Sequence, residues 1–420
     1  MTYRRAVYNF THPVKHVVVK RKFRKRRLIR YLFLLALILG LFLSPSEFFV
    51  SANDGNSAAE DLSKNVQDSL NKIDFGDLDE IANQLGDGDF NMFKNESFAS
   101  KVGKILSGEF ANDYPNLLVA MLALLGGVLM DVMPMIVLII AISILAGFMQ
   151  SLRHQSGGEG VRDVIHFVTY AAVVVIVLYA VADITLMTGK TLGSMKKQMD
   201  IIFPILLTLM AAIGGAVSVS VYQPAVVMLS AGVMQIFSFV IMPLFIITLV
   251  FGIVGNLSAT TKYDKFVSFF TSVFKWLMGL TFTVFFAFLA IQGITAGTHD
   301  GVSVRAAKLT ISSYVPFLGG YLSQGFDLVL ASSILIKNAV GVAGLYLLFG
   351  VVMKPVLYII VFSLGLRLAA AITQPIADAR ISNFLTSVNK AFSMLVACLI
   401  GAAFMYFITI GLIIITGNIL

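Results

Sequence analysis

The sequence predicts an all-α polytopic membrane protein with about six main transmembrane helices, and three observations lead to this fold class. Of the 420 residues, 58% are hydrophobic and only 13% are charged. Soluble domains carry about 25% charged residues, so this chain has too few to solvate its own surface. The mean hydropathy is +0.87, and the apolar runs are nearly continuous from Leu117 onward.

The net charge of +8 comes from the amino terminus. Residues 1–52 hold 11 Lys or Arg and a single acid, which is +10, so the other residues together carry −2. Residues 53–116 are the acidic part, with 13 Asp or Glu against 5 Lys. The basic character therefore indicates membrane targeting, and we expect no nucleic acid partner.

Residues 1–52 have the three regions of a secretory signal peptide. A basic n-region (1–30) precedes an apolar h-region (31–43), and Val50-Ser51-Ala52 is a small-residue cleavage site. The h-region is shorter than the roughly 20 residues of a spanning helix, although an uncleaved anchor is the alternative. In both cases the basic flank stays in the cytoplasm, so residue 53 onward is expected outside it.

Residues 53–116 are predicted to be a small, acidic, extracytoplasmic helical segment. Leu62, Val66, Leu70 and Ile73 recur at helical spacing, and Gly86-Asp87-Gly88-Asp89 interrupts the pattern. The acids lack the regular spacing of a calcium-binding loop, which favours solvated helices over a metal site.

Residues 117–420 are predicted to be the transmembrane domain. The first apolar run is too long for one crossing and contains Asp131 and Pro134, so we expect a re-entrant or in-plane amphipathic helix over 117–130 before a crossing over 134–150. Polar loops are expected outside at 189–202 and 297–313. The other expected crossings are 164–184, 225–254, 276–296, 340–366 and 391–415.

Internal repeats are predicted over 134–189, 204–297 and 316–417. Thr271-Ser272-Val273-Phe274-Lys275 recurs as Thr386-Ser387-Val388-Asn389-Lys390, 115 residues later. The spacing of three Pro and Gly residues also recurs, at an offset of 112 residues. These positions are Pro204, Gly232 and Pro243 in one copy and Pro316, Gly344 and Pro355 in the next.

A Gly- and Pro-punctuated stretch lies at the start of each later copy, and irregular backbone in a bilayer persists only where protein buries it or a cavity adjoins it. These stretches are therefore candidate hinges or re-entrant segments; amphipathic helices on the membrane face are the alternative. Their candidate residues are Pro204, Gly214, Gly215, Pro224, Pro316, Gly319 and Gly320.

No pattern typical of a catalytic, metal or cofactor site is present, so we expect no enzyme activity and no cofactor. Ionisable and polar residues inside spans are costly and mark candidate pathway positions. Lys337 and Arg367 could instead snorkel to the headgroups; of the two, we expect Arg367 to face protein or a water-filled cavity. The candidates are Asp131, Gln223, Gln235, Gln292, Lys337 and Arg367.

Several motifs resemble the stage III sporulation protein AE family, in order over residues 200–420. They are Gly214-Gly215-Ala216-Val217-Ser218, Gln223-Pro224, Met242-Pro243-Leu244, Gln292-Gly293-Ile294, the segment 300–308, Val315-Pro316-Phe317-Leu318-Gly319, the segment 331–341 and the segment 369–375. None is catalytic.

The resemblance implies a multi-pass, permease-like subunit of the secretion-like channel between mother cell and forespore. It would lie in the mother-cell membrane facing the forespore, with residues 53–116 between the two membranes. Its implied partners are other stage III sporulation membrane proteins, a separate ATPase subunit and a forespore-side partner. The alternative from the residues alone is a stand-alone secondary transporter of a small solute.

We predict cleavage after Ala52 and an extracytoplasmic segment 53–116. Amino-terminal sequencing of the membrane-bound protein should give Asn53 as the first residue, and a cysteine at Ser57 should react with an impermeant label from outside. A start at Met1 would contradict cleavage. Labelling of position 57 from the cytoplasmic side alone would contradict the topology.

Overall fold

The computed structural model describes residues 65–66, 68–70, 72–84, 96–109, 114–153, 159–257, 263–296, 309, 319–376 and 379–416. The predicted signal peptide, its cleavage site, Pro316 and all but Leu309 of the expected loop 297–313 lie outside these residues. Within them every regular element is a helix and no strand occurs. This agrees with the predicted all-α class.

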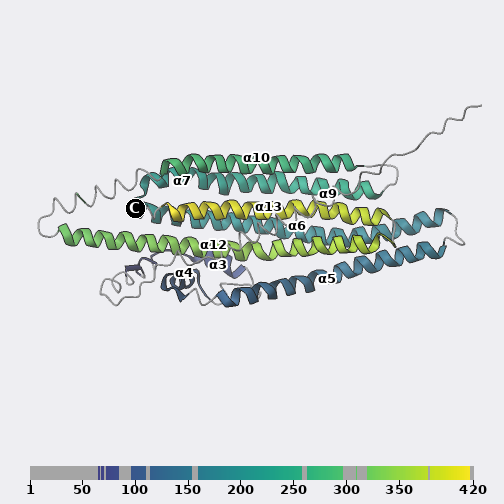
Figure 1. The fold of residues 1–420 in the computed structure, drawn as a ribbon, viewed down its shortest axis with the longest axis horizontal. Helices are drawn as coiled ribbons and strands as arrows, with labels where there is room; N and C mark the ends of the chain where they lie inside the picture. Colours follow the sequence, from purple (N-terminus) through teal and green to yellow (C-terminus); the bar gives the residue numbers. More distant parts are fainter. Residues whose placement is uncertain are drawn as a thin grey trace, which may run out of the picture. The chain divides into compact units, whose positions relative to one another are not determined.

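The long helices lie side by side and alternate in direction along the chain (Figure 1). Two short π-helical segments, η2 and η3, fall between α7 and α9. The elements are α3 (Gly76–Gln84), α4 (Phe98–Ser107), α5 (Tyr114–Arg153), α6 (Glu159–Ala212), α7 (Ala216–Val227), η2 (Met228–Val233), α8 (Met234–Ile236), η3 (Phe237–Ile241), α9 (Met242–Leu257), α10 (Asp264–Ala296), α12 (Gly319–Thr373) and α13 (Ala379–Ile415).

Six helical segments among the described residues are long and apolar enough to cross a membrane. Each crossing expected from the sequence overlaps a different one of them, and 134–150, 164–184 and 276–296 extend up to five residues beyond theirs. This confirms a multi-pass helical protein. The segments are Val119–Leu145, Phe167–Ala212, Ala216–Gly255, Lys265–Ile291, Gly325–Thr373 and Arg380–Ile415.

Helices α6 and α12 are longer than a membrane requires. They contain 54 and 55 residues, and at 1.5 Å per residue each is about 80 Å long, against a hydrocarbon core of about 30 Å. Both helices must therefore extend well beyond the hydrocarbon.

The prediction of a loop at 189–202 is wrong, because α6 continues through these residues without interruption. Leu192, Met195 and Met199 are buried at helical spacing, while Lys197 and Asp200 are exposed. The charged residues that suggested a loop lie on the outer side of an amphipathic helix, whose other face packs against the rest of the bundle.

The expected division of the first apolar run is also absent. Helix α5 continues through Asp131 and Pro134, and α12 likewise continues through Pro355. A proline inside a helix removes one hydrogen bond. Ending a helix within a bilayer would expose many more backbone groups, so an uninterrupted helix is the less costly solution.

Only the first of the two punctuated stretches contains a break among the described residues. Gly214 has φ of 86°, in the left-handed region that favours glycine, and it separates α6 from α7. In the second stretch α12 is helical from Gly319 onward. The described parts of the two stretches therefore differ in backbone conformation.

Helices α12 and α13 form the centre of the packing. In an apolar stretch of 18 residues within each span, 61% and 56% of the residues are buried, against 28% for α5. Helix α12 contacts α5, α6 and α13 along their lengths, and α13 also contacts α9. Glycines allow the closest approaches: Gly344 lies against Ile202 of α6, and Gly365 against Ile136 of α5.

Gly147 provides a test of this packing. A Cβ atom at this position would overlap the main-chain carbonyl of Ile376, in the turn between α12 and α13. We expect Gly147→Ala to destabilise the protein by about 1–3 kcal/mol, the usual cost of overpacking.

Gly126→Ala is the matched control on the same helix, because nothing lies within 4 Å of its added Cβ. Thermal unfolding in detergent should show a lower midpoint for Gly147→Ala only. Equal midpoints for the two variants would contradict the close contact between α5 and this turn.

Candidate functional site

A buried lysine from α12 holds the carboxyl end of α13. Lys337 is 0% exposed, and its Nζ donates to the carbonyl oxygens of Ile413 at 3.2 Å and Ile414 at 2.9 Å. The last carbonyls of a helix have no partner within the helix and carry its negative dipole end. The ammonium group therefore satisfies these carbonyls while they compensate its charge.

Two further contacts fix the same end of α13. Gly341, one turn after Lys337, lies directly against the side chain of Ile414. The hydroxyls of Tyr222 on α7 and Thr416 are 2.8 Å apart, and Thr416 also donates to the carbonyl of Leu412. Helices α7, α12 and α13 are thus joined at one place, which we call the α13 end site (Lys337, Gly341, Tyr222 and Thr416).

Polar side chains also connect α12 to its neighbours at other levels. The amide Nε2 of Gln198 on α6 donates to the carbonyl of Gly344 at 2.7 Å, and Gln198 is fully buried. The Ser363 hydroxyl donates to the side-chain oxygen of Asn389 on α13. Each bond ties α12 to one defined register of the adjacent helix, because a shift would leave a buried polar group unsatisfied.

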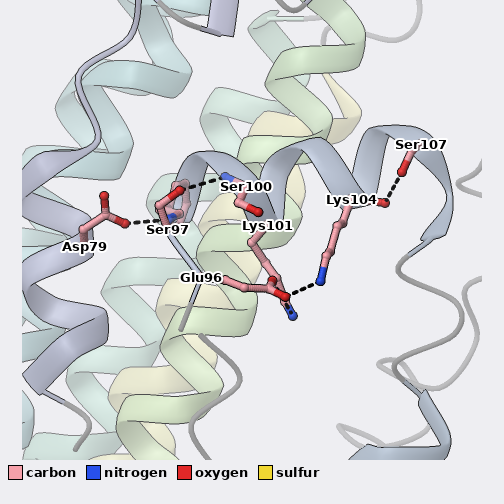
Figure 2. A network of polar contacts seen from close by, with 8 residues as sticks. Asp79, Glu96, Ser97, Ser100, Lys101, Lys104 and Ser107 are labelled. Carbon is pink, nitrogen blue, oxygen red and sulfur yellow. Dashed lines mark hydrogen bonds and ion pairs between the residues drawn. The ribbon is translucent and has the colours of Figure 1, made fainter. Parts of the chain in front are cut away.

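Helices α3 and α4 form a small polar network beside α6 and α12 (Figure 2). The side chain of Ser97 caps α4 by accepting from the Ser100 amide at 3.1 Å. Glu96 pairs with Lys101 and Lys104. Both helices lie in the segment that the sequence predicts to be helical, but only α3 is acidic, because α4 contains two lysines and no acid.

An ion pair connects this small network to α6. Lys197 Nζ lies 2.6 Å from a carboxylate oxygen of Glu80 on α3. Both side chains are about half exposed, so the pair fixes orientation more than it stabilises the protein.

The structure separates the predicted pathway residues into two environments. Asp131, Gln223, Gln235 and Arg367 are exposed on α5, α7, α8 and α12, and no hydrogen bond or ion pair joins them within the described residues. Lys337 alone is buried. The side chain of Gln292 lies outside the described part.

Lys337 and Arg367, both on α12, lie in different environments. Lys337 is buried and Arg367 is exposed, so contact of Arg367 with other protein or with a water-filled cavity stays a prediction. Both lie inside α12 and not at the ends of a shorter helix, since α12 extends far beyond the expected crossing 340–366.

Among the predicted hinge residues, Gly214 forms the break between α6 and α7. The amide of Gly215 donates to the carbonyl of Met210 at 3.0 Å, and a Cβ at position 215 would crowd that oxygen. Pro204 and Pro224 lie inside helices α6 and α7, and Gly319 and Gly320 begin α12. The sequence analysis did not identify Gln198 and Asn389 as residues that bond to α12. The available signal was a polar side chain within a segment that is otherwise amphipathic or apolar.

The chemistry of these groups is structural. Within the described ranges no three His, Cys, Asp or Glu side chains come close enough to hold a metal ion. The polar side chains described above bond mainly to main-chain carbonyls or to one another. Such an arrangement holds helices together in a membrane.

Six long apolar helical segments define a multi-pass helical membrane protein, and buried polar bonds join several of its helices. The family model described as "Stage III sporulation protein AE" matches residues 97–417, and the chain belongs to this family. The match extends from α4 to the end of α13, further toward the amino terminus than the motifs noted in the sequence.

One relative is the stage III sporulation protein AE of Bacillus subtilis (strain 168). It is 24% identical over 280 residues, which cover 67% of this chain and 70% of that protein. No solved structure matches the chain.

Lys337→Met should destabilise the α13 end site. The substitution keeps the length of the side chain but removes the donor, which leaves the carbonyls of Ile413 and Ile414 buried without it. We expect a loss of about 1–3 kcal/mol, seen as a lower thermal midpoint in detergent. Arg367→Met is the control, because Arg367 is exposed on the same helix. Equal midpoints for the two variants would contradict the capping role.

Proposed function

We propose that the chain is a permease-like subunit of a multi-protein transport or secretion-like channel between mother cell and forespore. Membership of a stage III sporulation family supports the sporulation role. The packing of the interior, described next, favours a subunit of an assembly over a self-sufficient transporter. We expect no enzyme activity.

The observation that carries the proposal is that the centre of the bundle is filled. Large aromatic side chains from six different helical elements are fully buried there, and close-packed interiors leave no room for an aqueous passage. They are Phe203, Phe237, Phe245, Phe285, Phe362, Phe384 and Tyr406. Any passage for cargo would then form between this chain and other subunits.

The outward-facing polar residues support the same conclusion. Asp131 lies near the middle of the candidate span Val119–Leu145 and is exposed on α5, and Arg367 is exposed within the span of α12. Exposed charge within a span is costly in lipid and is usually covered by protein or water. We therefore expect neighbouring subunits to cover these faces.

The proposed location is the mother-cell membrane facing the forespore, with the segment 53–116 extracytoplasmic. The proposed partners are other stage III sporulation membrane proteins, a separate ATPase and a forespore-side protein. Affinity purification from sporulating cells should recover these partners. Transport of a small solute by the purified chain alone in liposomes would favour the stand-alone transporter instead.

We also propose that residues 204–297 and 316–417 are structural copies, with 134–189 as a shorter relative. Helices α10 and α13 begin at Asp264 and Ala379, which are 115 residues apart, the same offset as the Thr-Ser-Val-x-Lys motif. Lys275 and Lys390 are consequently each the twelfth residue of their helix.

Arg367→Gln tests the assembly role. We expect normal protein level and thermal midpoint, because Arg367 is exposed and makes no ion pair within the described residues. We expect a marked loss of spore yield, which Arg367→Lys should largely restore if charge alone is needed. Near-normal spore yield with Arg367→Gln would show that Arg367 is only an interfacial anchor.

A further inference from the structure

The two copies of the Thr-Ser-Val-x-Lys motif meet in one surface groove between α10 and α13. The hollow has a volume of about 380 Å³. Five of the seven lining residues belong to the motif copies: Thr271, Ser272 and Lys275 from α10, and Ser387 and Lys390 from α13. Val267 and Ser268, on the preceding turn of α10, complete it. These residues lie on the surface, so packing of the bundle interior does not explain why the two motif copies meet.

The groove is positively charged, and none of its lining residues in the described part of the chain is acidic. Lys275 and Lys390 are exposed and make no hydrogen bond or ion pair within the described residues. Helices α10 and α13 contain four basic residues and one acid, Asp264, which is 11 residues, or about 16 Å, from Lys275 along the helix. Two close ammonium groups without a carboxylate favour an anion between them.

The hydroxyl groups add directional donors. Thr271 and Ser272 now donate to the carbonyls of Val267 and Ser268, at 2.7 and 2.8 Å. A hydroxyl hydrogen rotates about its C–O bond, so each can turn from the carbonyl to a ligand oxygen. Lysine ammonium groups together with hydroxyls are the groups that bind phosphate oxygens.

The surroundings of the groove indicate the membrane–water interface. Trp276, the single tryptophan of the chain, follows Lys275 and is 66% exposed. Beyond it α10 exposes Leu280, Val284 and Ile291. Tryptophan gathers at the headgroup level, with apolar side chains beyond it in the hydrocarbon. The groove would then lie among lipid phosphates.

We propose that the groove between α10 and α13 binds a phosphate anion through Lys275 and Lys390, and that an anionic phospholipid headgroup supplies it. Basic residues at a membrane surface favour anionic over neutral lipids, by about fivefold for each lysine. This inference concerns a different surface from Arg367 and does not depend on the proposed channel role.

Trp276 provides the readout, since it is the only tryptophan and adjoins the groove. The full-length protein is placed in nanodiscs of phosphatidylcholine that contain a small fraction of spin-labelled lipid. The label is carried on the headgroup of either phosphatidylglycerol or phosphatidylcholine. We expect stronger quenching of Trp276 by labelled phosphatidylglycerol, with the preference about fivefold weaker for each lysine changed to Gln.

Matched variants separate charge from folding. Lys275→Gln with Lys390→Gln should abolish the preference, whereas Lys275→Arg with Lys390→Arg should retain it. Lys354→Gln, an exposed lysine of α12 outside the groove, should leave it unchanged. Persistence of the preference in the double Gln variant would overturn the assignment to these lysines.

A competition experiment in detergent micelles distinguishes a lipid headgroup from free phosphate as the ligand. Inorganic phosphate that displaces labelled phosphatidylglycerol at millimolar concentration would support the same site with free phosphate as its ligand. Equal quenching by both labelled lipids, with no effect of inorganic phosphate, would overturn the proposal. In that case, cross-linking from position 275 to another sporulation membrane protein would assign the lysines to a partner helix.

Discussion

The packing of α12 against α13 is the interaction on which the other helices depend. Both helices are more buried than the α5 helix beside them, and α12 also contacts α5 and α6. Glycines at the contacts bring the backbones close, and polar side chains then bond to carbonyls across the interface, as at Lys337 and Gln198. Small residues and cross-helix hydrogen bonds are the means by which helices associate in lipid.

The polar groups inside the bundle and those on its surface have different consequences. Lys337 and Asn389 are satisfied by neighbouring helices of the same chain, so they specify the fold of the monomer. Asp131 and Arg367 are exposed on apolar helices and have no such partner within the described residues. The free energy of placing these charges in a membrane must be offset by groups outside the chain. We therefore expect function at the surface and not in the interior.

The sequence predicted what depends on composition and periodicity, namely the helical class, the six spans and the break at Gly214. It failed where the outcome depends on which neighbour covers a helix face. The segment 189–202 looks like a loop until Leu192 and Met199 are seen to be buried. The role of Lys337 stays open between a pathway residue and an interfacial anchor, because nothing local reveals that its acceptors, Ile413 and Ile414, lie 76 and 77 residues further along the chain.

That separation between Lys337 and its acceptors bears on how the protein is made. The chain emerges from the ribosome amino terminus first, so α12 is synthesised with its lysine while the carbonyls of Ile413 and Ile414 do not yet exist. An ammonium group without acceptors is unfavourable in hydrocarbon. Helix α12 must therefore wait, near water or the insertion machinery, until almost the whole of α13 has been added. The completion of α13 is then also the step that seats the central helix in the membrane.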